Sequence, residues 1–114
     1  MKDTQITNEE MKRIISEAIR ANTTKEFSVY LFGSRARGDN APDSDYDFLM
    51  IFNDELDKKT KSMISKSIRK LLADRLFGND DYFGSDVFIK SAKEYENAEE
   101  GTFLYAIKQE CIRL

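Results

Sequence analysis

The stretch LFGSRARGDNAPDSDYDFLMIF (residues 31–52) decides the fold of this chain. It starts in an apolar segment, breaks at Gly33, and ends in a second apolar segment, residues 46–52. The composition of that second segment predicts a strand that is buried on both faces. Asp45 and Asp47 lie where it begins, and a carboxylate there is costly unless a cation or a hydrogen-bond donor pairs with it.

Two other apolar segments predict further strands. Residues 27–32 (FSVYLF) are rich in aromatic and β-branched side chains, and residues 82–90 (YFGSDVFIK) resemble them in composition. The last four residues, CIRL, are either a terminal strand or only a tail. The chain therefore predicts a sheet of at least three short strands.

Capping signals and apolar periodicity predict the helices. Thr7 and Glu10 form a capping-box pair in front of apolar residues at helical spacing. Asn53 or Asp54 is expected to cap a second, longer helix, and one or two short helices follow over residues 91–109. The fold class is then α/β (α+β), a small mixed sheet with helices packed on it.

Length and composition limit what the protein can be. A chain of 114 residues predicts a single domain over residues 1–114. Its formal net charge of −3 argues against a general nucleic-acid coat, so direct nucleic-acid binding is not expected. No apolar run approaches the length that spans a membrane, and the N-terminus lacks the apolar core of a signal peptide. With one cysteine and hence no internal disulfide, we expect a cytoplasmic protein.

The absence of histidine narrows the possible chemistry. It excludes a Ser–His–Asp or Cys–His site and any zinc site with histidine ligands. Catalysis would have to use carboxylates, hydroxyls, Lys or Arg, backbone amides, or a metal held by oxygen. Oxygen ligands select hard cations such as Mg²⁺ or Mn²⁺.

Asp45 and Asp47 have the spacing of a metal-binding pair. Side chains alternate along a strand, so both carboxylates point to one face, about 7 Å apart at the backbone. Two metal ions about 3.5–4 Å apart fit that span and would stabilise both oxygens of an in-line displacement at phosphorus. Alone, however, two aspartates with this spacing are more often a solvated junction between a loop and a strand.

The turn at Gly33 and Ser34 has the composition of a phosphate site. A glycine there lets the backbone approach a phosphate closely, and a helical turn starting at Ser34 would direct its amides at the anion. Arg35 and Arg37 add forked donors that suit phosphate. The alternative is an ordinary Gly-Ser turn with surface arginines.

The combined pattern is more specific than its parts. Residues 33–47 follow G-S-x-A-R-G-x₆-D-x-D, flanked by strands on both sides. This resembles the nucleotidyltransferase superfamily related to DNA polymerase beta, and more closely its minimal nucleotidyltransferases (MNT proteins). The resemblance implies the polymerase-beta-like fold, with Gly33 and Ser34 on the triphosphate of ATP. It also implies two Mg²⁺ ions on Asp45 and Asp47, with Mn²⁺ as a possible substitute.

The family completes its site with a third carboxylate from the next strand. Asp80, Asp81 and Asp86 are the candidates. Asp80 and Asp81 lie in a segment typical of a turn. Asp86 lies inside an apolar strand with Val87 and Ile89 on the opposite face, where a carboxylate is costly unless it is paired. We therefore expect Asp86 to be the third metal ligand and to assist deprotonation of the acceptor hydroxyl.

We expect 114 residues to leave no room for a separate domain that binds an acceptor. The MNT resemblance implies a partner, a small helical HEPN toxin. It also implies that the chain transfers AMP from ATP to a tyrosine of this toxin and so acts as an antitoxin. Two alternatives remain open. The chain could be a non-catalytic antitoxin that neutralises its partner by binding, or an enzyme acting on a small molecule of the aminoglycoside type.

The C-terminal end departs from the family pattern. The family often closes its last helix with Glu-Gly and continues into a strand, whereas this chain has Glu110-Cys111. The missing glycine puts the predicted ending in doubt but not the chemistry. Cys111 is expected to be a small buried residue rather than a catalytic thiol.

Overall fold

The computed structural model describes residues 7–39, 46–77 and 85–114. The chain divides into two compact units, one made of residues 1–24 with 57–84 and the other of residues 25–56 with 85–114. The single domain expected over residues 1–114 therefore stays a prediction, and each unit is described separately.

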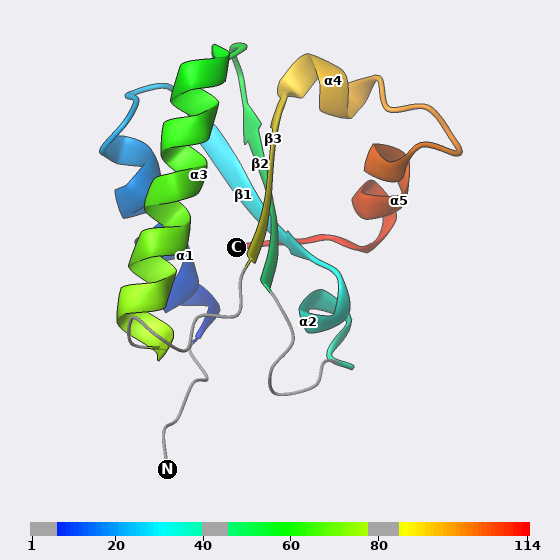
Figure 1. The fold of residues 1–114 in the computed structure, drawn as a ribbon. Coiled ribbons are helices and arrows are strands. Elements are labelled where there is room, and N and C mark those ends of the chain that lie inside the picture. The colour runs from blue at the N-terminus through cyan, green and yellow to red at the C-terminus, as the bar shows by residue number, and fades with distance from the viewer. Residues whose placement is uncertain (1–6, 40–45, 78–84) are drawn as a thin grey trace. The chain divides into compact units, whose positions relative to one another are not determined.

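The first unit is built from helices that lie side by side (Figure 1). They are α1 (Asn8–Arg20), α3 (Lys58–Leu72) and a π-helical turn, η1 (Ala73–Phe77), that continues α3. The apolar residues predicted at helical spacing in the first helix are all buried: Met11, Ile14, Ile15, Ala18 and Ile19. Polar contacts also join the helices, because Asn22 Nδ2 donates to Ser67 Oγ at 3.1 Å and Arg75 pairs with Glu17 at 3.1 Å.

The caps of these helices test the sequence predictions. The Thr7–Glu10 capping box is confirmed, since the Thr7 side chain accepts from the Glu10 amide at 3.1 Å. The predicted cap of the second helix is wrong. Asp57 caps α3, accepting from the Thr60 amide at 2.7 Å.

The two residues expected at that cap have other partners. The Asn53 amide donates to Glu26 Oε2 at 3.1 Å, and Asp54 pairs with Lys25 at 3.5 Å. Both contacts join the end of one strand to the start of another. Asn53 and Asp54 therefore link the ends of neighbouring strands, and α3 starts after them.

The second unit is a four-stranded mixed sheet with short helices (Figure 1). Its strands are β1 (Phe27–Phe32), β2 (Tyr46–Phe52), β3 (Ser85–Ser91) and β4 (Ile112–Arg113), in the order β3-β2-β1-β4. Its helices are α2 (Ser34–Arg37), α4 (Ala92–Glu96) and α5 (Phe103–Glu110). β1 runs antiparallel to both neighbours, and β2 runs parallel to β3.

The strand predictions are largely confirmed. The first two strands have the predicted bounds, and the third ends one residue later than expected, at Ser91. Residues 82–84 of the predicted third strand lie outside the described residues. The middle two residues of the final CIRL segment form a strand, because Ile112 pairs with Leu31 of β1. The mixed α/β fold class is confirmed.

The core of the second unit lies between one face of the sheet and the C-terminal helices. Phe32, Leu49, Ile51 and Ile107 form its buried centre. Around them pack Tyr30, Phe88, Ala92, Tyr95, Leu104 and Cys111. Every side chain of β2 is buried except that of Asp47, its second residue, as expected for a strand buried on both faces.

Candidate functional site

Asp47 and Asp86 are neighbours across two strands. They are register partners in the parallel pair of β2 and β3, and paired residues of parallel strands point to the same face. Adjacent strands lie about 4.8 Å apart, so the two side chains start close together. Of the predicted carboxylates, Asp45 lies outside the described residues.

The solvent exposure of Asp86 differs from what its place in an apolar strand predicted. A carboxylate buried within a strand was expected, but Asp86 is exposed to solvent. It lies in β3, which is an edge strand of the four-stranded sheet. The case for Asp86 as the third carboxylate therefore depends on its register with Asp47 and not on a cost of burial. Asp80 and Asp81 lie outside the described residues.

Gly33 brings the backbone directly over the carboxylate of Asp47. Its φ of 79° and ψ of −160° lie in a region that only glycine adopts readily. A Cβ placed on Gly33 would overlap Asp47 Oδ2 and lie 3.2 Å from Asp47 Cγ. The turn and the carboxylate thus occupy one site, and any side chain at residue 33 would separate them.

The predicted helical turn at Ser34 is present as α2. It begins at Ser34, and the amides of Ala36 and Arg37 both donate to the Gly33 carbonyl at 3.1 Å. A helix of four residues has little macrodipole, so anion binding here would depend on individual donors. The guanidinium of Arg35 lies 4.0 Å from the centre of the Tyr46 ring, so Tyr46 fixes its direction.

Arg37 is paired with carboxylates. Its Nη1 donates to Glu110 Oε2 at 3.0 Å and its Nε donates to Asp39 Oδ2 at 3.2 Å. These two hydrogen bonds raise the pKa of Arg37 above its ordinary value, the one to Glu110 contributing most. A role of Arg37 as a phosphate ligand stays a prediction, and the structure offers it another role.

Glu110 is a site residue that the sequence argument missed. Besides Arg37, it accepts from the Gly33 amide, with 3.2 Å between N and Oε1. The signal was visible, because the family resemblance includes a glutamate at the end of the last helix. However, a carboxylate 77 residues from Gly33 gives no local sign of its contact with the turn.

The residues present suit a hard cation. Asp47 and Asp86 supply carboxylate oxygens on one face, with the Ser34 hydroxyl in the adjacent turn. Mg²⁺ prefers such oxygen donors and is commonly held by one or two carboxylates together with substrate phosphates. Within the described residues there is no group of three acidic or thiol ligands that could hold a metal.

A groove lies on the same sheet face as Asp86. It has a volume of about 280 Å³ and is lined by Phe88, Lys90, Thr102, Phe103, Leu104 and Ile107. Phe88 follows Asp86 by two residues, so both side chains lie on one face. Phe103 is 63% exposed and lies edge-on to Phe88, with 5.4 Å between ring centres. An apolar surface therefore adjoins the carboxylates.

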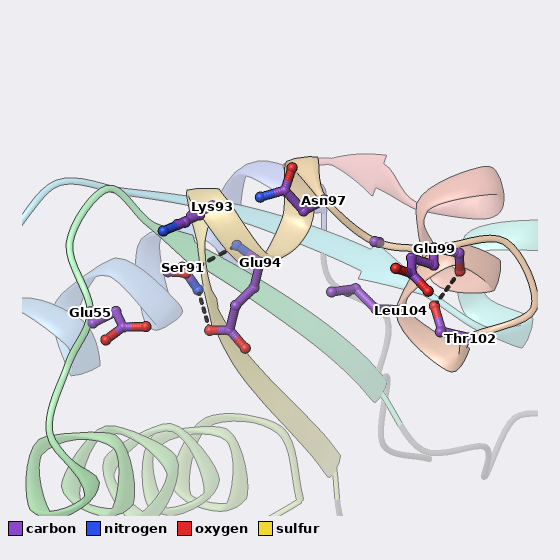
Figure 2. A pocket seen from close by; sticks show the side chains of 9 residues that line it. Glu55, Ser91, Lys93, Glu94, Asn97, Glu99, Thr102 and Leu104 are labelled. Atoms are coloured by element: carbon purple, nitrogen blue, oxygen red, sulfur yellow. Dashed lines mark hydrogen bonds between the residues drawn. The ribbon is translucent and has the colours of Figure 1, made fainter.

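A second cavity, of about 550 Å³, lies at the far end of β3 (Figure 2). It is lined by Glu55, Ser91, Lys93, Glu94, Asn97, Ala98, Glu99, Thr102 and Leu104. Ser91 and Glu94 face each other there as a capping box, with both hydrogen bonds at 3.1 Å. Ser91 is five residues along β3 from Asp86, about 16 Å, so this cavity is separate from the carboxylate site.

Cys111 lies against Tyr95 at the edge of the core. Its Sγ is 3.8 Å from the Tyr95 hydroxyl, and the Tyr95 ring stacks on Tyr30. Burial, followed by the hydrogen bond to Cys111, raises the pKa of Tyr95 to about 12. Cys111 was expected to be buried, but it is only half-buried and packs against the core from its edge.

Comparisons with known proteins address the family and the fold of the chain. The profile of the nucleotidyltransferase domain matches residues 11–102. No curated protein sequence matches the chain. No helix in the described part of the chain is both long and apolar enough to cross a membrane.

Solved structures show the same fold. A toxin–antitoxin complex with AMP-PNP is 23% identical over 94% of this chain and 72% of its own, with a TM-score of 0.58. A Sulfolobus solfataricus protein described as a candidate nucleotidyltransferase is 25% identical over 91% and 76%, with a TM-score of 0.57. An MNT antitoxin bound to a tri-AMPylated HEPN toxin of Shewanella oneidensis is 16% identical over 94% and 71%, with a TM-score of 0.54.

Proposed function

The chain belongs to the nucleotidyltransferase domain family, and from that premise we propose that it transfers AMP from ATP to a tyrosine of a HEPN-type toxin. In this reaction it would act as an antitoxin whose product is a silenced toxin. Support for the partner comes from the structural neighbours, which include an MNT antitoxin bound to an AMPylated HEPN toxin. Support for the nucleotide comes from the toxin–antitoxin complex that holds AMP-PNP.

The observation that carries the proposal is the register of Asp47 with Asp86 beside the Gly33 turn. The parallel pairing sets the two carboxylates side by side, and the glycine brings the backbone of the turn onto Asp47. Phosphoryl transfer depends mainly on positioning and on stabilising charge, so a compact site of this kind is sufficient.

The residues have separate roles in this reaction. Ser34 and the Gly33 turn hold the triphosphate so that the α-phosphorus faces the acceptor. Asp86, exposed at the edge of the sheet, accepts the proton of the tyrosine hydroxyl. The phenolic oxygen forms a bond to the α-phosphorus. The bond from the α-phosphorus to the oxygen that bridges it to the β-phosphate breaks, and pyrophosphate leaves.

Two Mg²⁺ ions would be held by Asp45, Asp47 and Asp86. Bound there, Mg²⁺ supplies positive charge that stabilises the phosphates and the leaving pyrophosphate. Arg35, directed by Tyr46, is the arginine that we place on the nucleotide.

Stoichiometry separates a catalytic antitoxin from one that only binds. HEPN ribonuclease activity is measured after incubation with increasing amounts of the chain, with and without Mg²⁺ and ATP. A catalyst silences an excess of toxin at substoichiometric amounts and only with ATP, and the modified tyrosine appears in mass spectra. If silencing needs one chain per toxin and is independent of ATP, the protein neutralises by binding and the proposed transfer is wrong.

A further inference from the structure

We infer that Glu110 is a positioning residue that holds the Gly33 turn in place for the nucleotide, an inference that rests on the function proposed for that turn. Glu110 is the last residue of α5 and comes from the opposite end of the chain. It lies at the turn because β4, which begins two residues later at Ile112, pairs with β1, which precedes the turn. The strand pairing thus brings the two segments together.

Both oxygens of Glu110 are used. Oε1 accepts from the Gly33 amide at 3.2 Å, and Oε2 accepts from Arg37 Nη1 at 3.0 Å. Gly33 precedes the single turn of α2 and Arg37 ends it, so one carboxylate holds both ends of that helix. We call these three residues the Glu110 brace.

The brace matters because Gly33 has little conformational preference of its own. Glycine visits many backbone conformations that other residues cannot, and the one seen here, with φ 79° and ψ −160°, is one among several. A bond from the Gly33 amide to a fixed carboxylate selects the orientation in which the turn lies over Asp47. Without the brace, the same turn would sample positions away from Asp47.

A different role for Glu110 would be to block the site by occupying donors meant for phosphate. The packing around Glu110 favours the brace. Ile107, one turn earlier in α5, is 3% exposed and accepts from the Cys111 amide at 2.9 Å. Ile112, two residues after Glu110, is paired with β1. Glu110 is therefore held from both sides and is not on a segment free to swing away.

The test compares the equilibrium affinity for Mg²⁺·AMP-PNP of the wild-type chain and its variants by calorimetry. Glu110→Ala removes both contacts and should weaken binding about tenfold. Glu110→Gln keeps an acceptor for the Gly33 amide but loses the charge opposite Arg37. Its affinity should therefore lie between those of the wild-type chain and Glu110→Ala. Glu96→Gln, which neutralises an exposed carboxylate on α4, should bind as the wild-type chain does.

A second readout follows the amide proton of Gly33 by NMR in the same proteins without nucleotide. We expect a large shift in Glu110→Ala, a small one in Glu110→Gln and none in Glu96→Gln. An unmoved Gly33 amide in Glu110→Ala would show that the contact is absent in solution and would overturn the brace.

These measurements separate a failure of the role inferred for Glu110 from a failure of the proposed AMP transfer. Unchanged affinity in Glu110→Ala would reduce Glu110 to a surface ion pair, and tighter binding would make it a blocking residue. Either result overturns the inference. If the wild-type chain binds AMP-PNP but transfers no AMP, the proposed reaction fails while the affinities still decide the role of Glu110. If it binds no nucleotide, both fail.

Discussion

Gly33 lies so close to Asp47 that a single added carbon would collide with the carboxylate. Gly33→Ala therefore combines a positive φ of 79° with an overlap on Asp47. The backbone conformation alone should lower the free energy of unfolding by about 1–3 kcal/mol. AMP transfer should be lost beyond what this destabilisation explains, because the turn must move off the carboxylate. Urea unfolding and transfer assays on the same protein measure both effects.

Gly101 provides the matched control. Its φ is also positive, at 93°, but a Cβ there would meet no atom of the described residues within 4 Å. Gly101→Ala should show the backbone cost and keep normal transfer. Equal losses of activity in the two variants would mean that the collision with Asp47 has no special role.

Asp86→Asn removes the base proposed for the tyrosine hydroxyl and keeps nearly the same shape. We expect kcat for transfer to fall by about 10²–10⁴, the usual contribution of general base catalysis. The affinity for Mg²⁺·AMP-PNP should fall much less, because the Gly33 turn and the other aspartates remain. Transfer by Asp86→Asn at the wild-type rate would remove Asp86 from the site.

Tyr95 gives the fold a defined sensitivity to alkaline pH. Its pKa is raised from 10.0 to about 12, and the uncharged form is favoured by burial and by the hydrogen bond with Cys111. Its contribution to stability is fully present below pH 10 and is lost as the pH rises toward 12. Urea unfolding across this range should show the loss, and Tyr95→Phe should flatten it. A Tyr105→Phe control should keep the wild-type profile.

The corrected cap of α3 makes a stability prediction. Asp57→Ala leaves the Thr60 amide without its acceptor and should lower the free energy of unfolding by about 1 kcal/mol. Asn53→Ala and Asp54→Ala remove only exposed contacts at the sheet edge and should cost less. If either costs more than Asp57→Ala, the helix begins in solution where the sequence first suggested.

The elements that the sequence predicted well are those with local signals. The first two strands have their predicted bounds because apolar runs bounded by turn residues define them, and the Thr7–Glu10 pair marks a helix start within four residues. The cap of α3 was misplaced because three cap-forming residues, Asn53, Asp54 and Asp57, follow one strand. Which of them caps is decided by contacts to Glu26 and Lys25, far away in sequence.

In the candidate site, too, residues with a local signal were predicted and those defined by long-range contacts were not. The motif of residues 33–47 indicated the glycine turn and the aspartates, and a strand carboxylate was enough to nominate Asp86. The pairing of Asp86 with Asp47 depends on β2 and β3 running in parallel, which the spacing of residues in the sequence does not reveal. Glu110 was missed for the same reason, because its contacts with Gly33 and Arg37 arise only when the last strand pairs with the first.

The most direct measurement uses ATP labelled on either the α- or the γ-phosphate. The wild-type chain and the Asp45→Asn, Asp47→Asn double variant are incubated with Mg²⁺ and the toxin that co-purifies from the native host. We expect label to reach the toxin from the α-phosphate only, and only with intact aspartates. Label from the γ-phosphate would indicate a kinase, and α-label transferred equally by the double variant would contradict the carboxylate site.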